Sequence, residues 1–118
     1  MSKDKNGSNE RNKYMNRHIT IPKNEIKAFC RRNYIRSFGL FGSALREDFG
    51  PGSDIDVLVE FEQAYRPGLM ELVEMQEELA RIFGQKVDLV ERQAVEKSEN
   101  YIRRRHILES VEPIYVAR

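Results

Sequence analysis

Short apolar segments of strand length alternate along this 118-residue chain with segments whose apolar residues recur at helical spacing. The expected strands cover residues 35–41, 55–61 and 87–90, with a shorter one at 114–116. The expected helices cover residues 20–33, 43–48, 68–84 and 95–110. Such alternation predicts an α/β fold, or an α+β fold if the strand order is mixed, in which helices cover a sheet of about three to four strands.

The length and composition of the chain predict one domain with a single core. Residues 1–17 are polar, with five Lys and Arg against two acidic side chains, so we expect a flexible tail followed by a folded domain over 18–118. We find no apolar stretch near the ~20 residues that span a bilayer, and no signal-peptide core. A single cysteine, Cys30, excludes an internal disulfide and favours a reducing cytoplasm.

The charge balance argues against a strongly basic nucleic-acid-binding protein, because 20 Lys and Arg face 19 Asp and Glu. The densest basic run is Arg103-Arg104-Arg105. It is either a surface for an acidic partner, RNA or nucleotide phosphates, or a solvated helix end where cations are favoured. Two histidines and one cysteine, widely separated, do not provide a zinc site.

Asp54 and Asp56 stand at the start of the second expected strand. Residues i and i+2 of a strand point to the same face, about 7 Å apart. Two carboxylates in an otherwise apolar strand repel each other, and a divalent cation would offset this repulsion. Mg²⁺ is favoured where one or two carboxylates act together with substrate phosphates. The alternative is an acidic strand start that faces solvent and has no further role.

Gly42-Ser43 follows the first expected strand. Glycine at such a junction allows a ligand to approach the backbone closely, and the N-terminus of a following helix favours phosphate. The Ser43 hydroxyl would cap this helix or donate to a phosphate oxygen. Arg46 lies three residues on and would make a forked contact to a further phosphate oxygen. Taken alone, a Gly-Ser pair indicates little more than a helix cap.

Asp88 interrupts the third apolar strand. A single carboxylate in such a strand is costly unless it is paired or bound to a metal. If this strand lies beside the Asp54–Asp56 segment, three carboxylates converge, as in sites where two metals promote displacement at phosphorus. The alternative is a solvent-facing Asp at a strand end.

Together these residues resemble the signature of the DNA polymerase β-type nucleotidyltransferases. Gly42-Ser43 is followed, after ten residues, by Asp54-Ile55-Asp56-Val57, with Ser53 before the first Asp. The segment around Asp88 comes next in the expected order. The resemblance covers about residues 34–115 and is strongest to the smallest members of the superfamily, the minimal nucleotidyltransferases (MNT domains, MntA-like antitoxins).

The resemblance implies a polymerase β-like fold and a role for each matching residue. Phosphates and nucleotide would be bound by Gly42, Ser43, Arg46 and Ser53. Mg²⁺ would be bound by Asp54, Asp56 and Asp88, and Asp88 would also act as the base. Where the family often has glycine after the arginine, this chain has Glu47, an acidic side chain that would weaken nucleotide binding.

The resemblance further implies a reaction and a partner. MntA-like antitoxins transfer AMP from ATP to a tyrosine hydroxyl of a HEPN-family toxin RNase, so we expect ATP as substrate and such a toxin as partner. The chain would then form a hetero-oligomer with the toxin, or a homo-oligomer. Two alternatives remain at this point: a non-catalytic antitoxin that covers a surface of its partner, and an aminoglycoside-type nucleotidyltransferase that modifies a small molecule.

Overall fold

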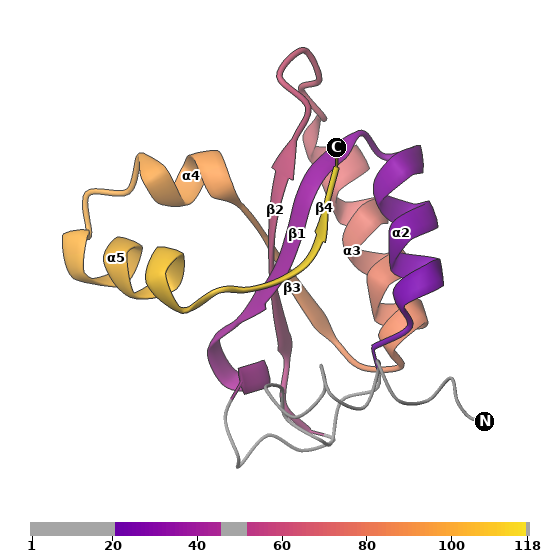
Figure 1. Cartoon of the computed structure of the whole chain (residues 1–118), viewed down its shortest axis with the longest axis horizontal. Coiled ribbons are helices and arrows are strands. Elements are labelled where there is room, and N and C mark those ends of the chain that lie inside the picture. Colours follow the sequence, from indigo (N-terminus) through magenta and orange to yellow (C-terminus); the bar gives the residue numbers. More distant parts are fainter. Residues whose placement is uncertain (1–20, 46–51, 118) are drawn as a thin grey trace.

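The computed structural model describes residues 21–45 and 52–117, and the predicted tail at 1–17 lies outside this part. One four-stranded sheet has the strand order β3-β2-β1-β4 (Figure 1). The strands are β1 (Ile35–Phe41), β2 (Ile55–Phe61), β3 (Val87–Glu91) and β4 (Glu112–Val116). β2 and β3 are parallel, whereas β1 is antiparallel to both β2 and β4, so the sheet is mixed, and the expected fold of helices on a sheet of about three to four strands is confirmed.

Helices cover both faces of this sheet (Figure 1). One face carries α2 (Lys23–Arg32) and α3 (Leu69–Phe83), and the other carries α4 (Arg92–Glu96) and α5 (Tyr101–Ser110). No helix in the described ranges is long and apolar enough to cross a membrane.

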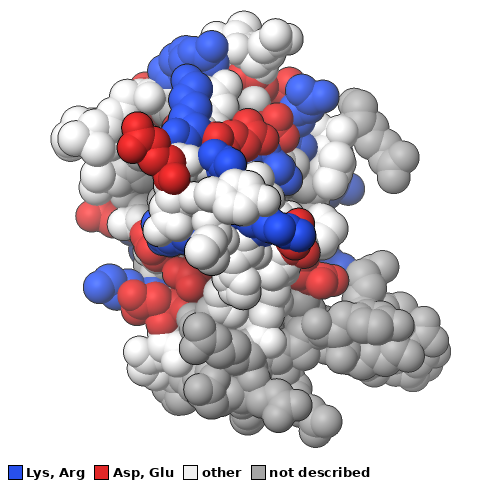
Figure 2. Space-filling view, turned by 90° about the vertical axis from the view of Figure 1, so that its left-hand side faces the viewer, with Lys and Arg blue, Asp and Glu red and all other residues white. Residues whose placement is uncertain are grey.

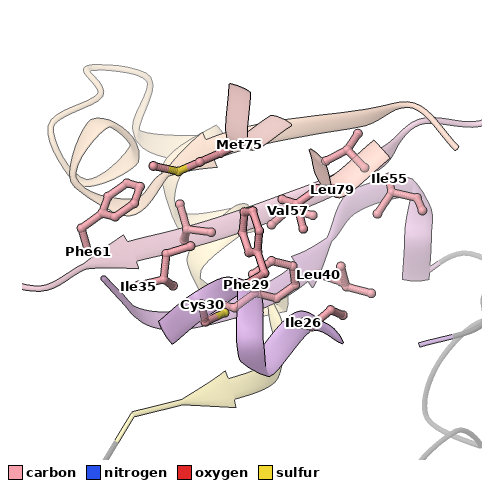
Figure 3. Packing of buried hydrophobic residues seen from close by; sticks show 13 residues of the cluster. Ile26, Phe29, Cys30, Ile35, Leu40, Ile55, Val57, Phe61, Met75 and Leu79 are labelled. Carbon is pink, nitrogen blue, oxygen red and sulfur yellow. The ribbon is translucent and has the colours of Figure 1, made fainter. Parts of the chain in front are cut away.

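The larger core lies between the sheet and the α2–α3 layer, as Figure 3 shows. Side chains alternate between the two faces of a strand. Val57 of β2 therefore joins this core, while its neighbour Leu58 joins a smaller cluster with Phe41, Val95 and Ile107 under α4 and α5. Strand β2 is buried on both sides, which explains its nearly continuous run of apolar residues.

Two expectations about the helices are corrected. The helix expected over 95–110 is two helices, because α5 begins only after Asn100, whose side chain caps it by accepting the Arg103 N–H at 3.0 Å. The short helix expected at 43–48 is a 3-10 helix, η1 (Gly42–Leu45), and residues 46–48 lie outside the described ranges.

Cys30 is fully buried on α2, and burial raises the pKa of its thiol to about 12. We therefore expect no reaction with iodoacetamide in the folded protein at pH 8, because the thiol is inaccessible and fully protonated. In 8 M urea the same thiol should react readily. Intact mass spectrometry checks this prediction, and alkylation at equal rates with and without urea would contradict it.

Candidate active site

Two of the predicted carboxylates are brought together by the parallel pair of strands. Asp56 of β2 stands opposite Asp88 of β3 in the sheet register, and residues opposite each other point to the same face. Two residues further on, Leu58 and Val90 belong to the cluster under α4 and α5. Asp56 and Asp88 therefore lie on the α4–α5 face, near the N-terminal ends of their strands.

Gly42 lies directly against Asp56. Phe41, the last residue of β1, pairs with Asp56 across the sheet, and the chain then turns through Gly42 at a φ of 68°. A β-carbon at this position would overlap the Asp56 carboxylate. Both the left-handed conformation and the space therefore require glycine. The turn between β1 and η1 thus places the Gly42 backbone against Asp56, one of the candidate metal ligands.

Asp54 lies just before β2, two residues ahead of Asp56, and is exposed. The segment that carries it is tied to the residues that precede β3. The Gln85 side chain donates to the Ser53 carbonyl at 3.1 Å, and the Ile55 N–H donates to the Lys86 carbonyl at 2.9 Å. The approach to β2 and the approach to β3 are therefore held side by side.

Two glutamines position this site, and sequence reasoning did not identify them. Gln85 holds the carbonyl of Ser53, and Gln76 of α3 accepts the Leu89 N–H of β3 at 2.9 Å. The second bond fixes the strand that carries Asp88, next to that residue. Neither glutamine belongs to a recognisable motif, because each acts on a segment that is distant in sequence.

The carboxylate chemistry suits Mg²⁺, although the residues that the structure describes do not form a complete ligand cluster. Carboxylate oxygens are the protein ligands that Mg²⁺ prefers, with phosphates and water completing its shell. Among the described residues, no group of three or more His, Cys, Asp and Glu lies close enough to hold a metal ion. The triad of Asp54, Asp56 and Asp88 therefore stays a prediction.

The predicted phosphate-binding residues are described only in part. Gly42 and Ser43 form the start of η1, and Ser53 lies in the segment before β2. Arg46 and Glu47 lie outside the described residues, so their contacts to a nucleotide stay predictions.

The basic run Arg103-Arg104-Arg105 of α5 lies on a surface that carries both basic and acidic side chains (Figure 2). Arg105 pairs with Glu109 at 3.0 Å, and Arg104 donates to the Ser98 carbonyl at 2.8 Å and lies over the Tyr101 ring. Figure 2, which looks onto the α4–α5 face, shows basic and acidic side chains interspersed. Of the two interpretations of this run, the solvated helix fits these contacts better than a patch of one sign.

Comparison with known families identifies the domain. Residues 23–111 match the family described as "Nucleotidyltransferase domain". The chain belongs to this nucleotidyltransferase family. It is 38% identical over 72 residues to protein adenylyltransferase MntA of Thermococcus cleftensis, a match that covers 61% of this chain and 68% of the relative. It is 35% identical over 81 residues to a putative protein adenylyltransferase of Methanocaldococcus jannaschii, covering 69% of this chain and 74% of the relative.

Solved structures of other proteins share this fold. A toxin–antitoxin crystal structure with AMP-PNP has a TM-score of 0.63 at 21% identity, over 83% of this chain and 76% of that one. A complex of tri-AMPylated Shewanella oneidensis HEPN toxin with MNT antitoxin has a TM-score of 0.56 at 22% identity, over 80% and 70%. A putative minimal nucleotidyltransferase has a TM-score of 0.59 at 25% identity, over 77% and 87%.

Proposed function

We propose that this nucleotidyltransferase is an antitoxin that transfers AMP from ATP to a tyrosine hydroxyl of a HEPN-family toxin in the cytoplasm, with Mg²⁺ as the cofactor. One observation carries the proposal: Asp56 and Asp88 stand in register on one sheet face, with Gly42 directly against Asp56. The names of the relatives, protein adenylyltransferases, support transfer to a protein.

The reaction joins the tyrosine oxygen to the α-phosphorus of ATP. The bond breaks between the α-phosphorus and the oxygen that bridges it to the β-phosphorus. Pyrophosphate leaves with the electron pair of this bond. The hydroxyl proton passes to the Asp88 carboxylate, directly or through one water molecule. The products are AMP-tyrosine and pyrophosphate.

The residues of the chain have distinct roles in this proposal. The backbone at Gly42 and Ser43, with Arg46 and Ser53, holds the phosphates in line for displacement. Asp54 and Asp56, with Asp88, would hold Mg²⁺, which supplies charge neutralisation on the phosphates when it is bound. Gln85 and Gln76 keep the carboxylate-bearing segments in position.

Nucleotide binding should be visible as thermal stabilisation. ATP with Mg²⁺ should raise the melting temperature more than ATP with EDTA, because a ligand of the native state stabilises that state by mass action. At a free concentration 100 times its dissociation constant, the gain is about 2.7 kcal/mol. Differential scanning fluorimetry measures the shift. Identical shifts with and without Mg²⁺ would argue against the metal-dependent site.

The proposed AMP transfer is tested by measuring the mass of the toxin. The chain is incubated with a candidate HEPN-family toxin, ATP and Mg²⁺, and the toxin should gain one or more AMP masses on tyrosine. Asp88→Asn should lose this transfer while it keeps its fold, because the two side chains have nearly the same shape. Glu99→Gln, an exposed carboxylate on the α4–α5 connection, is the matched control.

A different set of outcomes would show a binding antitoxin. The toxin would be neutralised without any gain in mass, and the Asp88→Asn protein would neutralise it as well as the unchanged chain does. AMP transfer to an aminoglycoside and not to the toxin would show instead that the acceptor is a small molecule.

A further inference from the structure

A basic cleft lies at the opposite edge of the sheet from β3. It runs between α2 and the edge strand β4, which Figure 1 shows beside each other and running in the same direction. The cleft is lined by Lys23, Asn24, Lys27 and Arg31 from α2 and by residues 114–117. No acidic side chain is among these lining residues.

The basic residues form one stripe along the helix. Lys23, Lys27 and Arg31 are spaced four residues apart, so they lie on the same side of α2, and each step advances about 6 Å along the helix axis. Lys27 and Arg31 form no ion pair with any described residue, whereas the neighbouring Arg32 is paired with Glu78 at 2.6 Å. The charge of the stripe is therefore open to a partner at Lys27 and Arg31.

The strand that forms the other wall has an open edge. The Ala117 N–H points toward β1 and donates to the Arg36 carbonyl of that strand at 2.7 Å. Because backbone groups alternate in direction along a strand, the N–H and C=O of Val116 point to the open side. Val116 is also 59% exposed. The end of β4 can therefore accept a further strand, whereas Pro113 has no N–H to donate.

We propose that this cleft binds an extended acidic segment of a partner polypeptide, which adds a strand to β4. In an extended chain, side chains on one face recur about every 6.6–6.8 Å, close to the step of about 6 Å between the cations of α2. Alternate Asp or Glu residues of the added strand would thus face Lys27 and Arg31 in turn. Backbone hydrogen bonds to Val116 provide affinity, as in other cases of β-strand addition, and the charges provide specificity.

The observations favour this occupant over two others. The tail of the chain itself, with five basic and two acidic side chains over residues 1–17, has the wrong charge for a basic cleft. A nucleic acid would use the cations, but it has no peptide backbone to form β-sheet hydrogen bonds with Val116. The proposal involves no residue of the Asp56–Asp88 site, so its failure would leave the proposed transfer reaction unaffected.

Fluorescence anisotropy with a labelled eight-residue peptide of alternating Glu and Thr tests the proposal on the full chain. We expect saturable binding that weakens as salt rises, and weaker binding of a peptide with the four Glu in one block. Lys27→Glu with Arg31→Glu should lower affinity about tenfold or more, because like charges then face each other. The matched control is Arg81→Glu with Lys97→Glu, which makes the same charge change at exposed positions outside the cleft.

The backbone part of the proposal has its own test. Val116→Pro removes the N–H that points outward and leaves the bond from Ala117 to Arg36 in place, so it should abolish peptide binding without unfolding the protein. A second measurement needs no variant: in the unchanged chain, the bound peptide should slow hydrogen exchange of the Val116 amide. Any of three results would overturn strand addition. The folded Val116→Pro protein would bind the peptide as well as the unchanged chain, the peptide would leave the hydrogen-exchange rate of the Val116 amide unchanged, or the chain would bind an eight-nucleotide poly-U with equal affinity.

Discussion

Replacing both Asp54 and Asp56 by Asn should reduce AMP transfer by about a thousandfold or more. Removal of metal ligands forfeits several kcal/mol of transition-state stabilisation, and each 1.36 kcal/mol corresponds to a factor of ten in rate. The fold should persist, because Asp54 is exposed and Asp56 is only half-buried. Rates are measured as AMP-labelled toxin under single-turnover conditions, with circular dichroism as the check on folding.

The same double variant should also lose the part of the thermal shift that ATP gains from Mg²⁺. This readout does not depend on the toxin, so it separates a lost metal site from a lost acceptor contact. Glu77→Gln with Glu99→Gln removes two exposed carboxylates elsewhere and should change neither measurement. Transfer within threefold of the unchanged chain would refute the role assigned to Asp54 and Asp56.

Gly42→Ala should impair both stability and transfer. A left-handed φ costs a residue with a β-carbon about 1–2 kcal/mol, and here the β-carbon would also overlap the Asp56 carboxylate. The carboxylate must then move, and a displacement of about 1 Å in a catalytic site can cost about a hundredfold in rate. Urea denaturation measures the first effect, and the transfer assay measures the second.

Gly84→Ala is a matched control for this variant. Gly84 ends α3 with a φ of 72°, similar to that of Gly42, but a β-carbon there would meet nothing within 4 Å. Its replacement should therefore cost a similar amount of backbone strain without an effect on transfer. If Gly84→Ala and Gly42→Ala lowered transfer equally, general destabilisation would explain both, and contact with Asp56 would not matter.

The local features of the fold could be predicted from the sequence because their causes lie within a few residues. Short apolar runs of strand length predict β1, β2 and β3, and the spacing of Asp54 and Asp56 places both on one side of the segment that enters β2. Gly84 was expected to end α3 and does so in the left-handed conformation that glycine allows. The order of Gly42-Ser43 and the two aspartates was also sufficient to indicate the family, which residues 23–111 confirm.

The tertiary structure alone decided how these pieces meet. Asp88 stands opposite Asp56 because β3 pairs with β2 in one particular register, and a shift of one residue would have turned Asp88 to the other face. Register depends on packing across the whole sheet, and on bonds such as those from Gln85 and Gln76, which no local pattern encodes. Likewise, Leu69 and Val73 fit the apolar stripe of α3 yet are exposed. Periodicity predicts which side of a helix is apolar, whereas the extent of the sheet beneath the helix determines how much of that side is covered.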